Sequence, residues 1–243
     1  MPIQIEQPGY LHRQGMREKN EDMIWPWPGK ANDQNRLFVV CDGVGGNVYG
    51  EKASYLACEQ TAAFMHKQDP DLNNLVPFVE KKFTETINMQ PDHFGMATTL
   101  LFLRLLEDSA QIGWVGDSRA YHIRDGKVMY QTEDHSLVNR LIQTGEITPQ
   151  EARYDPRKHV LLRALQGEHK PTETDLVKIE NLLPGDFFLL CSDGILEALD
   201  EAFIQNHFHP QFSTDKVTHY IQAQCEGKTV DNYSMYLVKV IGV

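Results

Sequence analysis

Short apolar runs bounded by turn-forming residues mark the strands that we expect in this chain. Asp125-Gly126 separates Tyr121–Ile123 from Val128–Tyr130, which is a good hairpin signal. Hairpin-linked strands pair in antiparallel fashion, so we expect mainly antiparallel sheets. The predicted strands are Leu37–Cys41, Thr98–Leu106, Ala110–Val115, Ala120–Arg124, Thr174–Ile179, Asp186–Cys191 and Tyr233–Val240.

Helical periodicity appears in two separate blocks. Gly50–Lys67 and Leu72–Met89 form the first, and the second of these carries an apolar stripe at helical spacing. Ile195–Leu199, Ala202–Phe208 and Asp215–Gln224 form the other block. Helices that arrive in groups between runs of strands cover the faces of sheets. The pattern therefore predicts an α+β fold, a sandwich of two sheets flanked by helix pairs.

The segment Asp134–Ala164 differs from its surroundings. It is polar, follows a hairpin and contains two short helical pieces, Ser136–Gln143 and Pro149–Ala152. We interpret it as a surface insertion of about residues 134–164. The sequence shows no internal repeat, low-complexity tract or linker, so residues 1–243 are predicted to form a single domain.

The charge balance narrows the choice of partners. The formal net charge is −11, and no run of basic residues offsets it, which argues against binding to nucleic acid or to an anionic membrane surface. We see no signal peptide and no apolar run long enough to span a bilayer, so a cytoplasmic location is expected. The four cysteines form no C-x-x-C pair, and Cys41 and Cys191 are expected in the core. The acidic surplus has two interpretations, a solvated acidic surface or carboxylates gathered around divalent metal ions.

Five short acidic motifs favour the second interpretation. Several follow apolar strands, and an Asp before a Gly at a strand end can hold its carboxylate in place while the backbone turns. Hard divalent cations prefer such oxygen ligands. Each motif alone is typical of a turn, and the glycine-rich one lacks the Lys-Ser/Thr of a P-loop. The motifs are Arg17-Glu18-Lys19-Asn20-Glu21-Asp22, Asp42-Gly43-Val44-Gly45-Gly46, Gly116-Asp117-Ser118-Arg119, Ser192-Asp193-Gly194 and Asp231-Asn232.

In order and spacing, these motifs resemble those of the metal-dependent protein phosphatases of the protein phosphatase 2C type (the PPM family), in their compact bacterial form. The resemblance runs from Gly15 to the C-terminal strand. It implies a four-layer α-β-β-α sandwich, in agreement with the pattern above, and it makes Asp134–Ala164 the flap beside the active site. It also implies two Mn²⁺ or Mg²⁺ ions per chain and a weaker third.

The resemblance assigns roles to the first motif. Arg17 looks like the arginine that grips the substrate phosphate with two prongs, a contact that Lys could not match. Glu21 looks like a ligand of the second metal. Asp22 resembles the acidic neighbour that holds metal-bound water.

The remaining motifs supply the other ligands by the same resemblance. Asp42 resembles the carboxylate that bridges both metals, and Gly43 the residue that offers its backbone carbonyl. Asp193 and Asp231 look like the other ligands of the first metal. Asp117 resembles the carboxylate that binds the third metal together with Asp193.

One departure concerns the proton donor to the leaving oxygen. Val44 stands where eukaryotic members carry a His that is a candidate general acid. A metal-bound water or His135 could serve instead, although His135 also has a structural interpretation near a helix start. The C-terminal motif continues as Tyr233-Ser234, which replaces side chains but no ligand.

The resemblance implies a protein serine/threonine phosphatase in which a metal-activated water attacks the phosphate. Its partners would be phosphorylated proteins and a cognate Ser/Thr kinase that it opposes, and the chain is expected to be a monomer. Two alternatives stay open, a phosphatase of small phosphometabolites and a catalytically silent phosphoprotein-binding module of the same fold.

Overall fold

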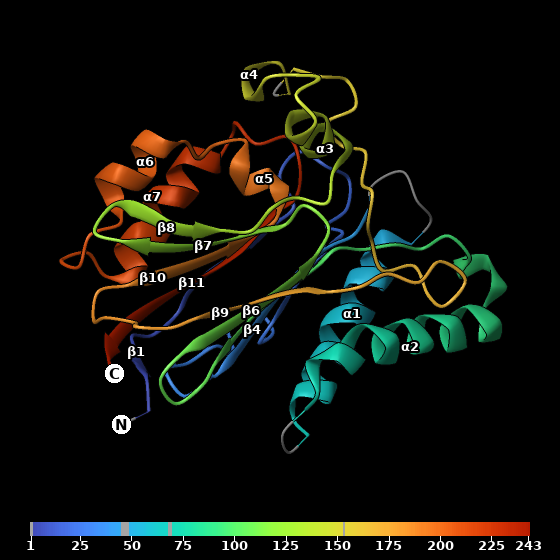
Figure 1. Cartoon of the computed structure of the whole chain (residues 1–243), viewed down its shortest axis with the longest axis horizontal. Coiled ribbons are helices and arrows are strands. Elements are labelled where there is room, and N and C mark those ends of the chain that lie inside the picture. Colours follow the sequence, from blue (N-terminus) through green and yellow to red (C-terminus); the bar gives the residue numbers. More distant parts are fainter. Residues whose placement is uncertain (1, 45–48, 68–69, 153) are drawn as a thin grey trace.

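Two antiparallel β-sheets pack face to face in the computed structural model, which describes residues 2–44, 49–67, 70–152 and 154–243 (Figure 1). The first sheet has the order β1-β11-β10-β7-β8, with β2 also paired to β11. Its strands are β1 (Gln4–Ile5), β2 (Gly9–Arg13), β7 (Arg119–Arg124), β8 (Lys127–Gln131), β10 (Phe187–Cys191) and β11 (Tyr233–Gly242). The second sheet has the order β3-β4-β5-β6-β9. Its strands are β3 (Asp22–Trp25), β4 (Leu37–Asp42), β5 (Leu100–Leu105), β6 (Ala110–Val115) and β9 (Asp175–Ile179).

Helices cover the outer face of each sheet. Helices α1 (Gly50–Met65) and α2 (Leu75–Met89) pack on the second sheet, and short 3₁₀ turns lie at Leu72–Asn74 and Pro91–His93. Helices α5 (Asp193–Leu196), α6 (Glu201–His207) and α7 (Thr214–Cys225) cover the first sheet. The structure confirms the predicted four-layer α-β-β-α sandwich.

Strand alternation divides the apolar residues among three cores. In β10, Phe188 and Leu190 face the other sheet, whereas Phe187 and Leu189 face α6 and α7. In β4, Val40 lies between the sheets and Cys41 faces α1. Both strands are buried on both sides, which explains why they read as continuous apolar runs.

The two short helices predicted within residues 134–164 are also present. Helices α3 (Leu137–Gln143) and α4 (Pro149–Ala152) project from one end of the sandwich (Figure 1). Ser136 caps α3, since its hydroxyl accepts a hydrogen bond from the backbone N–H of Asn139 at 3.3 Å. We call residues 134–164 the flap.

Three strands and one helix start were not predicted. Strands β1, β2 and β3 have only two, five and four residues, so none leaves an apolar run as long as those of β4 and β10. The helix predicted at Ile195–Leu199 begins at Asp193 and ends at Leu196. Among the described residues, no helix combines the length and apolar character needed to cross a bilayer.

Candidate active site

The predicted acidic motifs meet at one end of the sandwich. Asp22 begins β3 and lies opposite Asp42 at the end of β4, in the register of that strand pair. Asp193 starts α5 directly after β10, and Asp231 lies just before β11. Asp117 occupies the turn between β6 and β7. Antiparallel pairing thus brings together side chains that lie far apart along the chain.

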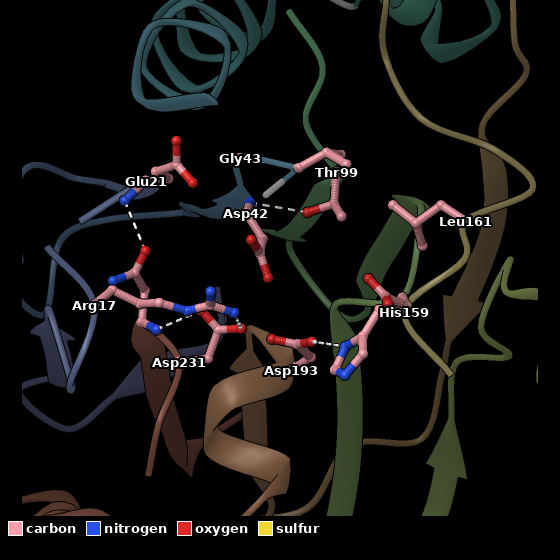
Figure 2. Close-up of a pocket in the computed structure, with 12 residues that line it drawn as sticks. Arg17, Glu21, Asp42, Gly43, Thr99, His159, Leu161, Asp193 and Asp231 are labelled. Carbon is pink, nitrogen blue, oxygen red and sulfur yellow. Dashed lines mark hydrogen bonds and ion pairs between the residues drawn. The ribbon is translucent and has the colours of Figure 1, made fainter. Parts of the chain in front are cut away.

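These residues line a cavity of about 360 Å³ (Figure 2). Seven residues named from the sequence are among its walls: Arg17, Glu21, Asp42, Gly43, Asp117, Asp193 and Asp231. Val44, Thr99, His159, Leu161 and Asn232 complete the lining. Gly45 and Gly46 of the second motif lie outside the described residues.

Hydrogen bonds from the neighbouring strand hold the Asp42 backbone. The hydroxyl of Thr99 accepts from the backbone N–H of Asp42 at 2.9 Å, and the backbone N–H of Thr99 donates to the Asp42 carbonyl at 2.8 Å. The next residue must be glycine. A Cβ on Gly43 would lie 2.5 Å from the backbone of Gly50 and 2.7 Å from the carbonyl oxygen of Glu21. The close approach of three segments therefore fixes Asp42 at the cavity.

Asp22 is buried beneath this cavity. The Ser192 hydroxyl donates to its Oδ2 at 2.8 Å, whereas Oδ1 has no hydrogen-bond partner among the described residues. Burial, followed by the nearby charges of Asp193 and Asp231, raises the pKa of Asp22 to about 7, although hydrogen bonds from Ser234 and Ser192 oppose the shift. An orphaned buried carboxylate oxygen is costly unless a cation or a water satisfies it.

Asn232 ties the first motif to the last. Its side-chain oxygen accepts from the backbone N–H of Glu21 at 2.8 Å, and its amide donates to the carbonyls of Gln14 at 2.7 Å and Lys19 at 2.8 Å. The loop that carries Arg17 and Glu21 is thereby fixed beside Asp231. The sequence offered the Asp231-Asn232 pair as a motif but gave Asn232 no role.

Arg17 contacts a carboxylate of the predicted ligand set. Its Nε and one terminal nitrogen donate to the two oxygens of Asp231 at 2.9 and 2.7 Å, and its side chain is 52% exposed. In Figure 2, Asp42, Asp193 and Asp231 point toward one another. Glu21 instead lies beside Gly50, where an added Cβ would be 2.9 Å from its Oε1. In the described part of the chain, no three His, Cys, Asp or Glu side chains are already closed around one point as a metal site.

The carboxylates destabilise one another. Burial and the charges of Asp22, Asp193 and Asp117 raise the pKa of Asp42 well above its ordinary value. Burial and Asp193 raise the pKa of Asp117 to about 8, and burial and Asp231 raise that of Asp193 to about 6. Like charges in a half-buried cavity favour protonation or the arrival of a cation.

The donor set fits divalent metal ions of the hard class. It consists of carboxylates and a backbone carbonyl, with no thiol among the cavity walls. Cys41 and Cys191 are buried in the cores on the helix-facing sides of β4 and β10, as predicted. The orphaned oxygen of Asp22 and the mutual repulsion of the carboxylates favour the same interpretation. Glu21, Asp42, Gly43, Asp193 and Asp231 are the residues that would hold two metals, and Asp117 with Asp193 a third.

His135 lies outside the cavity. Its Nδ1 accepts a hydrogen bond from the backbone N–H of Gly116 at 3.1 Å, and its Nε2 faces Asp175 at 3.3 Å. Its ring stacks on Trp114 with 5.9 Å between centroids. Burial and Arg163 lower the pKa of His135. These contacts indicate that His135 positions the turn that carries Asp117.

A different histidine reaches the cavity from the flap. Nδ1 of His159 lies 3.9 Å from Oδ2 of Asp193, and its side chain is 57% exposed (Figure 2). Leu161 follows it in the wall. No local motif marks His159, because its place in the site depends on how the flap folds back.

Comparison with known proteins agrees with this geometry. Residues 15–225 match the family model described as protein phosphatase 2C. The serine/threonine protein phosphatase PstP of Mycobacterium tuberculosis is 30% identical over 235 residues, which are 93% of this chain and 43% of that protein. The chain thus spans less than half the length of this curated relative.

Two solved structures share the whole fold. The serine/threonine phosphatase Stp1 of Staphylococcus aureus aligns with a TM-score of 0.85 and 26% identity, over 100% of this chain and 98% of that one. The catalytic domain of PstP in complex with two manganese ions aligns with a TM-score of 0.81 and 29% identity, over 98% and 100% of the two chains.

Proposed function

Since this chain belongs to the protein phosphatase 2C family, we propose that it is a metal-dependent protein serine/threonine phosphatase. The observation that carries the proposal is the convergence of Asp42, Asp193 and Asp231 on one cavity beside Arg17. The manganese complex of the related PstP domain supports Mn²⁺ as a cofactor here, with Mg²⁺ as the alternative.

The chain's own residues divide the work of phosphate hydrolysis. When bound, the metal ions would supply an ionised water and offset the charge of the phosphoryl oxygens. Arg17 would leave one or both oxygens of Asp231 and grip the phosphate through two parallel N–H donors. Asp22, held by Ser192, would orient the attacking water through its free oxygen. We propose His159, which lines the cavity 3.9 Å from Asp193, as the proton donor to the leaving oxygen in place of His135.

We propose that the substrates are phosphoproteins and that the enzyme reverses their phosphorylation by a cognate Ser/Thr kinase. The cavity is shallow enough for Arg17 and His159 to stay more than half exposed, which suits a phosphorylated side chain on a protein better than an enclosed metabolite. A cytoplasmic location and a monomeric state remain predictions from the sequence.

The test compares substrates with and without metal. We expect the protein to hydrolyse p-nitrophenyl phosphate and a phosphothreonine peptide with Mn²⁺, and EDTA to abolish both activities. We also expect Mn²⁺ to raise the melting temperature of the wild type but not of Asp193→Asn. Faster hydrolysis of sugar or nucleotide phosphates than of the peptide would favour the metabolite alternative. Manganese binding without hydrolysis would favour the silent binding module.

A further inference from the structure

A second groove lies at the opposite end of β4 from the active site. Its volume is about 560 Å³, and its walls include Trp25, Trp27, Lys30, Arg36 and Arg104. It forms because α1 ends at Met65 while the second sheet continues beyond it. We call this the basic groove.

Register explains how the two arginines come together. Leu37 of β4 lies opposite Arg104 of β5, and the backbone N–H of Leu105 donates to the carbonyl of Arg36 at 2.8 Å. Phe102 and Leu100 of the same strand face the α1–α2 core, so strand alternation places Arg104 on that helix-facing side. There it lines the groove together with Met65, the last residue of α1.

The positive charges of the groove lack acidic partners. None of the ion pairs formed among the described residues involves Lys30, Arg36 or Arg104. Among the described residues, the Arg36 side chain donates to the backbone carbonyls of Asp33 and Asn35 alone, at 3.0 Å each. The described residues that line the groove include no Asp or Glu. On a chain of net charge −11, a cluster of unpaired cations is unusual and predicts an anionic partner.

The aromatic residues favour a peptide over a nucleotide. Trp27 stacks on Tyr55 with 5.1 Å between centroids and planes 6° apart, and Trp25 meets Trp27 edge-on at 4.7 Å. Because other rings already contact these indoles, they are poor platforms for a base. Together they form a firm, partly apolar wall beside the cations, which suits the side chains and backbone of a peptide segment.

We propose that the basic groove docks an acidic segment of the phosphoprotein substrate, an inference that rests on the proposed phosphatase function. The remainder of the acidic surface would repel such a segment, so the groove gives it one favourable place to bind. Leu37 lies at the groove and Asp42 at the active site, five residues apart on one strand, which is a separation of about 17 Å. A substrate that occupies both sites therefore needs at least about five extended residues between its phosphate and its acidic cluster.

The experiment uses phosphothreonine peptides with a four-residue acidic cluster placed 3, 8 or 12 residues away. Matched peptides carry glutamines in place of the acids. For wild type we expect kcat/KM to favour the acidic peptides by about fivefold at the two longer spacings, as two or three partly exposed ion pairs would give. At the shortest spacing no preference is expected. Hydrolysis of p-nitrophenyl phosphate should be the same in every variant.

The variant Lys30→Gln/Arg104→Gln should lose the preference. Lys81→Gln/Lys127→Gln makes the same change in net charge away from the groove and should keep it. A readout independent of catalysis is the anisotropy of a labelled acidic peptide without phosphate, which should bind wild type and the control but not the groove variant. Circular dichroism verifies that each variant is folded, and 0.5 M NaCl should abolish the wild-type preference without any mutation.

The possible outcomes separate the two proposals. Absence of any manganese-dependent hydrolysis overturns the phosphatase function. Hydrolysis that ignores the acidic cluster, or a preference that survives Lys30→Gln/Arg104→Gln, overturns the docking proposal alone. The acidic peptide could also be displaced by a mononucleotide at a lower concentration than by an unlabelled glutamate peptide. That result overturns the docking proposal in favour of a nucleotide site.

Discussion

Asp42 and Asp186 are both aspartates at the ends of buried strands, yet their surroundings are opposite. Asp186 is fully buried, and Arg124 donates to its two oxygens at 2.6 and 2.7 Å. His122 lies 3.0 Å from Oδ2, and the backbone N–H of Leu183 donates to it at 2.9 Å. Although burial opposes the shift, these hydrogen bonds hold the pKa of Asp186 well below its usual range. At Asp42, burial and neighbouring carboxylates act in the same direction and raise the pKa.

The difference shows which carboxylates are neutralised by partners within the fold. The protein neutralises the charge of Asp186 with its own cation, whereas Arg17 is the one arginine or lysine among the described residues of the wall that holds Asp42, Asp117, Asp193 and Asp231. A cluster whose negative charge exceeds that of its protein cations is stabilised by protonation or by an external cation. The comparison therefore distinguishes an aspartate that is neutralised within the fold from aspartates that are not, without reference to any relative, and substitutions at both places test it.

The largest effect is expected at the active site. Asp42→Asn should lower manganese-dependent hydrolysis of p-nitrophenyl phosphate by about a thousandfold, because it removes the carboxylate that two metals would share. Without metal, the same change should raise the melting temperature by about 2–4 °C, since it removes one of several repelling charges. Activity assays and thermal melts in EDTA at pH 7.5 measure both.

Asp117→Asn is the matched comparison for Asp42→Asn. It should stabilise the metal-free protein by a similar amount, because burial and the charge of Asp193 also raise the pKa of Asp117. It should retain more activity than Asp42→Asn, because Asp117 would hold only the weaker third metal. A metal-free protein that is destabilised by Asp42→Asn would contradict the view that these carboxylates repel one another.

At Asp186, stability rather than activity should change. Asp186→Asn should lower the free energy of unfolding by about 3 kcal/mol, toward the lower end of the range for a buried pair because Arg124 is partly exposed. The folded-state pKa lies below the unfolded value, so this stabilisation is complete above the unfolded pKa of about 4 and is lost as pH falls through the folded value. Urea titrations at pH 7 and pH 3 should show the difference between wild type and variant narrowing in acid.

Asp155 offers the matched control. Arg157 donates to it with Nε at 3.0 Å and a terminal nitrogen at 2.8 Å; the Arg157 side chain is 50% exposed and that of Asp155 is 11% exposed. Asp155→Asn should lower the free energy of unfolding less than Asp186→Asn does, because half of the Arg157 side chain stays in water. An equal loss at both positions would show that the arginine fork, rather than burial, governs the cost.

Arg17→Lys tests the arginine that lies beside the pocket carboxylates. A lysine cannot fork onto two phosphate oxygens, so kcat/KM for a phosphothreonine peptide should fall about thirtyfold. Manganese should still raise the melting temperature at least as much as in wild type, because Asp231 loses a two-pronged competitor. If metal affinity fell in step with activity, Arg17 would be organising the ligands rather than holding the substrate.

Most of the fold could be predicted from the sequence alone, but fewer of the residues around the site could. Strands such as β4 and β10 are buried on both faces and are visible as apolar runs, whereas β3 has only four residues, the first of them an aspartate, and is too short to stand out. The carboxylates could be found because each follows a strand or a turn with its own motif. Thr99, Ser192 and Asn232 could not, since their roles depend on which strand lies beside which. For the same reason the sequence suggested His135 and not His159, because which histidine reaches the cavity depends on how the flap folds.

The smallest effect concerns those two histidines. His159→Ala should lower kcat for a phosphothreonine peptide by about tenfold, since an alkoxide leaving group needs a proton. Hydrolysis of p-nitrophenyl phosphate should change less, because its leaving group departs readily as an anion. His135→Ala should instead lower the melting temperature and affect both substrates equally, because it removes the support of the Gly116–Asp117 turn. Equal losses on both substrates for His159→Ala, with an unchanged melting temperature, would assign His159 to substrate binding and leave proton donation to water.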